Sequence, residues 1–128
     1  MAKCYMMEFT DKVTHKRFYK FGVTKHMDAM KRFTDPVHGK VYEDFDIKCV
    51  ASIIGSDESV IFLESALLEM FPKNIWLEEY LGDQRTWDGF SGITEIVALN
   101  EEQYKKAVRV FYNVKERVKK WKARALSG

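Results

Sequence analysis

The stretch Arg17–Phe33, RFYKFGVTKHMDAMKRF, contains the residue types that phosphate chemistry uses. An aromatic segment ends at Gly22, where the absence of a side chain lets another backbone come close. Cationic and hydrogen-bond-donating side chains follow. A guanidinium presents a planar fork of donors to phosphate oxygens, and an ammonium acts as a point charge. The stretch therefore indicates either a phosphate site at a sheet edge or an ordinary strand-to-helix turn; the side chains concerned are Lys25, His26, Lys31 and Arg32.

Glu64 is the candidate metal ligand in the middle of the chain. It lies in the segment 56–71, SDESVIFLESALLEMF, at the margin of an apolar stripe that includes Val60, Leu63 and Leu67. One carboxylate, together with water and a substrate phosphate, is a normal arrangement for Mg²⁺. The alternative is a solvated acid that flanks the buried side of an amphipathic helix.

The hydrophobic pattern predicts the elements that must position these groups. Aromatic and long apolar residues in short runs favour strands, and a three- to four-residue spacing favours helices. The order hairpin, helix, strand, helix, strand, helix predicts an α+β fold, with a small central antiparallel sheet of three to four strands flanked by three helices. The predicted strands are 3–9, 17–23, 41–55 and 93–99, and the predicted helices are 25–33, 56–71 and about 100–124.

Side-chain directions follow from the same pattern. In the third strand, alternation places Phe45, Ile47, Cys49 and Ala51 on one face. In the helix 56–71, we expect Met70 to extend the inward stripe.

Several segment ends and loops carry recognisable signals. Ser56 and Asn100 are predicted N-caps, and Pro72 is a predicted stop. The glycine-rich region after Pro72 is predicted to be irregular. Its aromatic side chains either anchor a long loop to the core or stack on a nucleic-acid base; they are Trp76, Trp87 and Phe90.

The order of these motifs resembles the GIY-YIG nuclease superfamily. CYMMEF (residues 4–9), YKFGVT (residues 19–24), FLESALLEMF (residues 62–71) and GITEIV (residues 92–97) match, in order, the segments of its phage-rich branch, whose second motif reads Tyr-Lys-Ile-Gly-x-Thr. The resemblance covers roughly residues 3–98. It implies a central antiparallel sheet and divalent-metal hydrolysis of a DNA phosphodiester, with Mg²⁺ or Mn²⁺ as cofactor.

The resemblance also implies roles for individual residues. Tyr5 matches the tyrosine of the first motif, which helps to orient the attacking water. Gly22 matches the glycine of the second motif, Arg32 is the candidate phosphate-binding arginine, and Glu64 matches the metal-binding glutamate. Gly22, which would let a substrate backbone approach, and Lys25, His26 and Lys31 are candidate nucleic-acid contacts near the same phosphate.

The second motif leaves a choice between Tyr19 and Lys20. Adjacent residues on a strand point to opposite faces, so these two side chains cannot both reach one phosphate. Lys20 lies two positions before Gly22 and therefore shares its face. We favour Lys20 as the inward group, although the superfamily often has a tyrosine there. This departure leaves an inactive relative that binds without cutting as an alternative.

The C-terminal segment is strongly basic. From Lys105 to Arg124 there are nine basic residues and one acid, Glu116, whereas acids outnumber bases in the rest of the chain. A basic helix either follows a nucleic-acid backbone or is a solvated helix face. The candidate DNA contacts on it are Lys115, Lys119 and Lys122.

The remaining features bound the class of protein. The 128 residues fit one domain, 1–128, that ends in the basic helix. Cys4 and Cys49 lie in apolar surroundings without metal-ligand spacing, which indicates reduced cytosolic thiols. We expect no signal peptide, no membrane segment, and a cytoplasmic protein, including a phage protein that acts inside a bacterial host.

Two functions are therefore expected from the sequence. The leading expectation is a DNA endonuclease or nickase. The alternative is a catalytically inactive accessory protein with the same fold that binds nucleic acid or a host protein partner.

Overall fold

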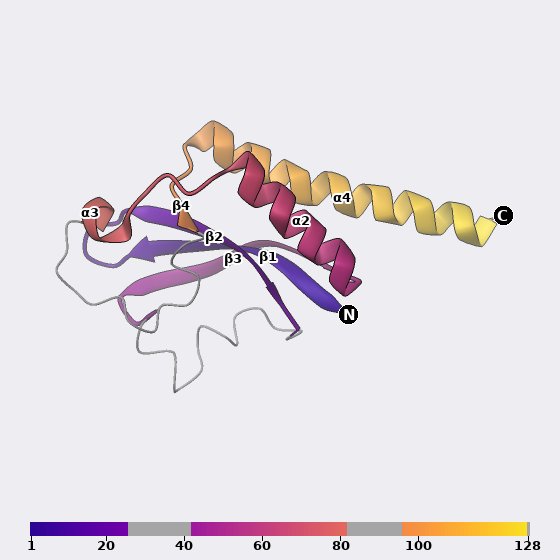
Figure 1. Ribbon diagram of the computed structural model, residues 1–128, viewed down its shortest axis with the longest axis horizontal. Coiled ribbons are helices and arrows are strands. Elements are labelled where there is room, and N and C mark those ends of the chain that lie inside the picture. The colour runs from indigo at the N-terminus through magenta and orange to yellow at the C-terminus, as the bar shows by residue number, and fades with distance from the viewer. Residues whose placement is uncertain (26–41, 82–95, 128) are drawn as a thin grey trace. The chain divides into compact units, whose positions relative to one another are not determined.

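The computed structural model describes residues 1–25, 42–81 and 96–127. The chain divides into two units, 1–98 and 99–128, and each is described by itself. The first unit contains a four-stranded antiparallel sheet in the order β3-β1-β2-β4 (Figure 1). The sheet and the three described helices confirm the predicted α+β class.

The strands β1 (Ala2–Asp11) and β2 (Arg17–Thr24) form the predicted hairpin at the centre of the sheet. Asp11 closes the turn, since its buried carboxylate accepts hydrogen bonds from the backbone N–H groups of Val13 and Thr14, both at 2.8 Å. His15 has the left-handed φ of 62° that reverses the chain. The outer strands are β3 (Phe45–Gly55) and β4 (Ile96–Val97).

The hairpin register assigns every side chain to one of two faces. Tyr5 lies opposite Gly22, and Met7 lies opposite Lys20. Because side chains alternate along a strand, one face carries Tyr5, Met7, Phe9, Phe18 and Lys20, and we refer to it as the Tyr5 face. The other face, the Cys4 face, carries Cys4, Met6, Tyr19 and Phe21.

A β-bulge corrects the predicted face of Ala51. Met6 pairs with Ala51 but Met7 pairs with Cys49, so Val50 is an extra residue in β3. An extra residue reverses the alternation beyond it. Ala51 therefore lies on the Cys4 face with Met6, whereas Cys49 lies on the Tyr5 face.

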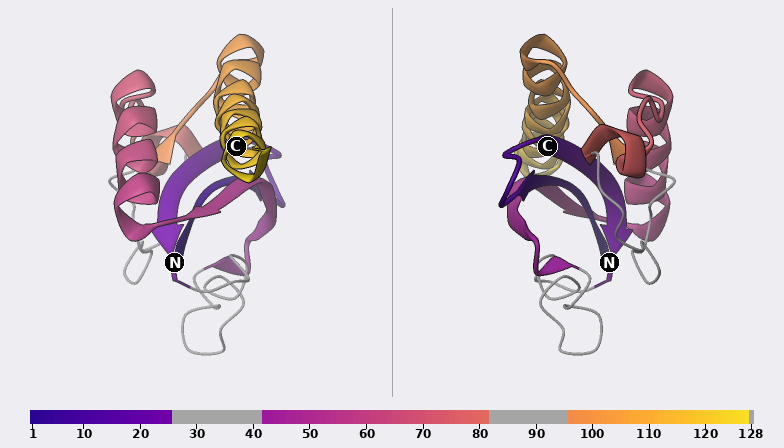
Figure 2. Two further views of the ribbon diagram at one scale, coloured as in Figure 1. Left: turned by 90° about the vertical axis from the view of Figure 1, so that its right-hand side faces the viewer. Right: turned by 90° about the vertical axis from the view of Figure 1, so that its left-hand side faces the viewer.

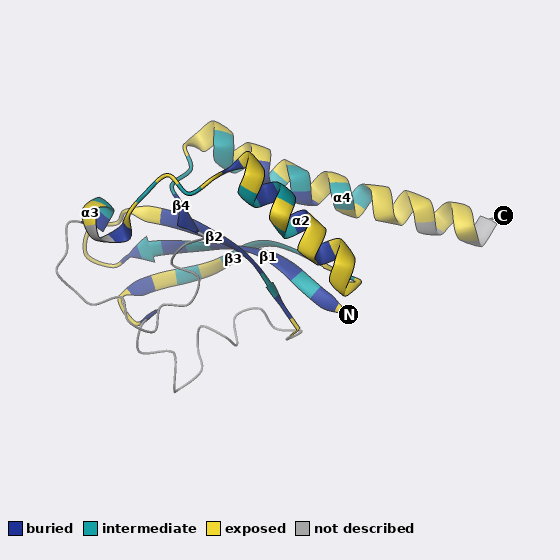
Figure 3. Cartoon of the chain, in the orientation of Figure 1, coloured by how far each residue is buried: buried dark blue, intermediate teal, exposed yellow. Residues whose placement is uncertain are grey.

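Helix α2 (Asp57–Met70) lies over one face of the sheet (Figures 1 and 2), and the ring contact described next identifies it as the Cys4 face. Its buried side chains are Val60, Leu63 and Leu67, and the Phe71 ring that follows the helix stacks on Phe21 of β2. Met70 is 42% exposed, so its predicted inward position is wrong. Since α2 is exposed along its outer side (Figure 3), only a narrow stripe packs on the sheet.

Both predicted signals at the ends of α2 are confirmed. The Ser56 hydroxyl accepts from the backbone N–H of Ser59 at 3.2 Å, which satisfies one donor of the first turn. At the other end the backbone N–H of Phe71 still donates to the Leu67 carbonyl, and Pro72 follows. Pro72 lacks an N–H and therefore cannot continue the helix.

Helix α3 (Leu77–Leu81) lies in the region that the sequence analysis treated as irregular. Leu77 and Leu81 contribute to an aromatic-rich core with residues of the Tyr5 face. Within this core the rings of Phe9 and Phe18 stack with their centroids 4.9 Å apart. Its apolar residues Leu77, Tyr80 and Leu81 have the spacing of a helix, but five residues are too few for this spacing to predict one. The core also contains Tyr5, Met7, Tyr42, Phe45 and Ile96.

Helix α4 (Glu101–Ser127) makes up most of the second unit. Asn100 caps it as predicted, in a reciprocal pair: its side-chain oxygen accepts from the N–H of Gln103 at 2.8 Å, and the Gln103 side chain accepts from the N–H of Asn100 at 2.9 Å. None of the described helices is long and apolar enough to span a bilayer.

Candidate functional site

The Tyr5 hydroxyl and the Lys20 ammonium are hydrogen-bonded on the Tyr5 face. The Nζ atom of Lys20 donates to the Tyr5 oxygen at 3.3 Å and lies 5.8 Å from the centroid of the Tyr5 ring. Tyr5 is 0% exposed and Lys20 is 2% exposed. As predicted, Lys20 lies on the same face of β2 as Gly22, and Tyr19 lies on the other. The role of Lys20 as the group that faces a phosphate stays a prediction.

Gly22 makes room for this pair. The Tyr5 ring lies so close over Gly22 that a Cβ atom there would be 2.5 Å from the Tyr5 Cζ atom. We expected Gly22 to allow an approaching substrate. Instead, the space that its missing side chain leaves is filled by the phenol of Tyr5, which Gly22 thereby holds beside Lys20.

Tyr19 lies on the opposite face of β2. Its hydroxyl donates to a carboxylate oxygen of Glu8 at 3.1 Å, across the pair that the two residues form in the ladder. The structure therefore does not place Tyr19 with Tyr5 and Lys20. Glu8 was not predicted as its partner, although the hairpin register, once the turn is known, sets the two residues opposite each other.

Glu64 is half-buried on α2, the helix on the Cys4 face. It is close enough to act on Cys4: burial raises the pKa of the Cys4 thiol to about 12, and the negative charge of Glu64 contributes in the same direction. Glu64 therefore lies on the side of the Cys4 face, whereas Tyr5 and Lys20 lie on the Tyr5 face.

Tyr5 and Cys4 occupy adjacent pairs of the β1–β2 ladder, with Tyr5 opposite Gly22 and Cys4 opposite Val23. In the described residues β4 pairs with β2 at Tyr19 and Lys20 only, so Gly22 and Val23 have no described strand partner on the side away from β1. The sheet therefore separates Glu64, on the Cys4 face, from Tyr5 and Lys20 on the other face.

Glu64 is the predicted metal ligand among the described residues. Across residues 1–25, 42–81 and 96–127 there is no group of three or more potential ligands among His, Cys, Asp and Glu side chains. A divalent cation at Glu64 would therefore need its other ligands from water and from a substrate.

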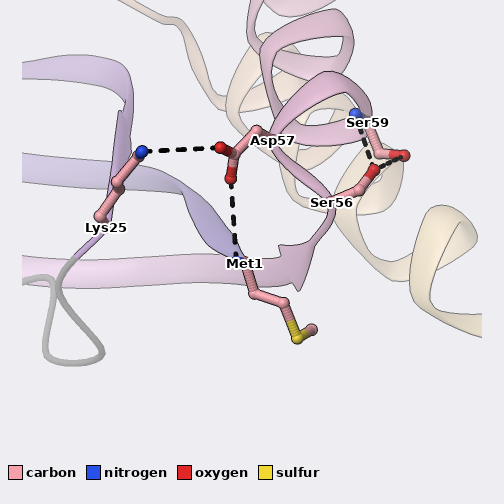
Figure 4. A network of polar contacts seen from close by, with 5 residues as sticks. All are labelled: Met1, Lys25, Ser56, Asp57 and Ser59. Atoms are coloured by element: carbon pink, nitrogen blue, oxygen red, sulfur yellow. Dashed lines mark hydrogen bonds and ion pairs between the residues drawn. The ribbon is translucent and has the colours of Figure 1, made fainter.

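Lys25, a predicted nucleic-acid contact, belongs to an ion-pair network at the start of α2 (Figure 4). Its Nζ atom lies 3.6 Å from one oxygen of Asp57, and the amino group of Met1 lies 3.9 Å from the other. Lys25 remains 81% exposed. Asp57 therefore offsets part of the charge that Lys25 presents to an anion, because exposed pairs of this kind are weak.

The other predicted contacts are only partly described. His26, Lys31 and Arg32 lie outside the described residues, and so does the side chain of Lys122. On α4, Lys115 is exposed, and Lys119 is exposed beside Glu116 at 3.6 Å. Both positions present cations to solvent.

In comparisons with protein families, curated proteins and solved structures, none matched this chain. The functional assignment therefore depends on the residues and their geometry.

Proposed function

We propose that this protein binds DNA and hydrolyses its phosphodiester bonds with the help of a divalent cation. The observation that carries the proposal is the hydrogen bond between Tyr5 and Lys20, which come from the two strands that the nuclease resemblance singles out. A phenol both accepts and donates, so Tyr5 can accept from Lys20 and donate to a water or phosphate oxygen.

The proposed reaction needs little covalent chemistry from the protein. A water oxygen attacks phosphorus, the bond from phosphorus to one bridging oxygen breaks, and that oxygen takes up a proton to become a hydroxyl end. Tyr5 orients the water, and Lys20 stabilises the charge that develops on the phosphate. A Mg²⁺ ion held by Glu64 would supply neutralising charge when bound, but from the other face of the sheet.

A second candidate is DNA binding without cleavage, and the burial of the site favours it. Because Tyr5 and Lys20 are almost fully enclosed, a phosphate reaches them only if covering side chains move. Helix α2 also carries Glu64 on the other side of the sheet. In this case the exposed lysines of α4 supply the affinity.

A nicking assay on supercoiled plasmid separates the two candidates. The chain is incubated with Mg²⁺, with Mn²⁺ or with a chelator, and the variants are Glu64→Ala and a matched control, Glu69→Ala, an exposed acid of the same helix. Hydrolysis predicts metal-dependent nicking that falls at least about 100-fold in Glu64→Ala and persists in Glu69→Ala. Salt-sensitive binding without nicking supports the second candidate, and the absence of both refutes a role on DNA.

A further inference from the structure

Trp76 is a large aromatic side chain that the fold does not bury. It directly precedes α3 and is 69% exposed. The Nζ atom of Lys73 lies 3.7 Å from the centroid of its ring. A cation at this distance over an indole is a favourable contact, which holds the ring in place and adds positive charge beside it.

A second cation and a second aromatic ring lie one helical turn away. The backbone N–H of Tyr80 donates to the Trp76 carbonyl at 2.9 Å, which fixes the two residues on neighbouring turns. The Nζ atom of Lys16 donates to the Tyr80 carbonyl at 2.6 Å and lies 5.3 Å from the centroid of the Tyr80 ring. The Tyr80 hydroxyl donates to the Arg17 carbonyl at 2.8 Å.

Cations therefore lie near the exposed Trp76 ring and the half-buried Tyr80 ring. Exposed Lys16 and Arg17 come from the end of the β1–β2 turn and the start of β2, and half-buried Lys73 comes from the segment after α2. Glu79 is an exposed acid in the same helix and reduces the local positive charge. Aromatic rings that alternate with cations bind unpaired nucleic acid, since bases stack on the rings and phosphates approach the cations.

We infer that Lys73 and Trp76 form a stacking platform for an unpaired base of single-stranded nucleic acid. Lys73 covers one side of the indole, and a base stacks on the exposed remainder. Lys16 and Arg17 attract the adjoining phosphates. This inference rests on the proposed action on DNA and specifies the substrate as one with a single-stranded or frayed portion.

Fluorescence anisotropy with labelled oligonucleotides tests the platform. The probes are a thymidine 20-mer, a uridine 20-mer and a blunt duplex, all at one salt concentration. We expect Trp76→Ala to weaken binding of the single strands about tenfold and to change duplex binding less than about twofold. Phe62→Ala, which removes a 77% exposed ring from α2, is the matched control and should leave all three affinities unchanged.

Two further variants exclude a trivial loss of structure. Trp76→Phe keeps a ring and should retain most of the single-strand affinity, whereas Lys73→Gln should lose part of it. Circular dichroism and thermal melting of Trp76→Ala should match the wild type, since the side chain is exposed. A difference between the thymidine and uridine probes identifies DNA or RNA as the preferred strand.

The outcomes separate this inference from the proposed function. Metal-dependent nicking, combined with unchanged single-strand binding in Trp76→Ala, overturns the platform alone. Single-strand binding that depends on Trp76, without nicking or duplex binding, supports the platform and refutes hydrolysis.

Discussion

The phenol of Tyr5 occupies the space in which Gly22 would carry a side chain. A Cβ atom at position 22 would lie 2.5 Å from the Tyr5 Cζ atom and 3.1 Å from Cε1. The Gly22→Ala variant must therefore displace Tyr5, and we expect it to lose about 1–3 kcal/mol of unfolding free energy in urea denaturation. Gly55→Ala is the control, because a Cβ atom there would meet Val60 at an ordinary 3.6 Å. Combining Gly22→Ala with Tyr5→Leu should recover part of the loss; equal costs at Gly22 and Gly55 would contradict this account.

Lys20 allows stability and function to be separated. Its ammonium is buried, so part of the interaction with the Tyr5 hydroxyl compensates for lost hydration. Replacing the ammonium by an apolar group of similar length removes that desolvation cost. We expect Lys20→Met to melt within a few degrees of the wild type, or above it, while nicking of plasmid is lost. Retained nicking in a folded Lys20→Met would show that Lys20 does not contact the phosphate.

The thiol of Cys4 makes stability depend on pH in the alkaline range. Burial, followed by the charge of Glu64, raises the pKa of Cys4 from 9.0 to about 12 in the folded chain. The unfolded chain loses the thiol proton first, so the free energy of unfolding is unaffected by Cys4 below about pH 9 and falls as the pH rises toward 12. Urea denaturation from about pH 7 to about pH 11 should show this fall in the wild type and a shallower one in Cys4→Ala. Identical slopes would exclude Cys4 as the cause.

His15 carries backbone strain in the β1–β2 turn. Its φ of 62° lies in the left-handed region, which glycine adopts readily and β-branched residues adopt at a cost. We expect His15→Val to lower the unfolding free energy by about 1–2 kcal/mol and His15→Gly to cause no loss. Thermal melting of both variants measures the order of their stabilities, and Val13→Ala, at an exposed position, is the control. A His15→Val variant as stable as His15→Gly would mean that the turn relaxes.

The lysines of α4 can be tested through the salt dependence of binding. Each lysine that contacts a phosphate releases about one counterion. For the double variant Lys115→Gln/Lys119→Gln, we expect the slope of log K against log salt concentration for duplex DNA to become shallower by about two. Lys12→Gln, an exposed lysine of the β1–β2 turn, should leave the slope unchanged. An unchanged slope in the double variant would indicate a solvated helix face.

Much of the fold could be predicted because local signals agree with the global arrangement. Ser56 and Asn100 are polar residues at helix starts, and both act as N-caps. The alternation of YKFGVT separated Tyr19 from Lys20 correctly, since the period of a strand leaves no other choice. These features depend on a few neighbouring residues, so they can be predicted without knowledge of the rest of the chain.

The missed features depend on pairing between distant segments. The bulge at Val50 is set by the register of β3 against β1, and no residue type in β3 predicts it. The position of Glu64 relative to Tyr5 depends on which face of the sheet α2 covers. Periodicity places a residue on a helix margin but does not select between the two faces of a sheet. The contact between Lys73 and the Trp76 ring was also not predicted, because many solvated lysines lie three residues from an aromatic residue.

The alternation of side chains along β2 has a consequence for insertions in the hairpin. Successive residues from Phe18 to Val23 alternate strictly between the Tyr5 face and the Cys4 face, which α2 covers. Inserting a single residue before Phe18 while the turn stayed fixed would exchange the two sets, so that the ammonium of Lys20 would lie beneath α2 and the ring of Phe21 beside Tyr5. We therefore expect this hairpin to tolerate substitutions far more readily than insertions or deletions of single residues.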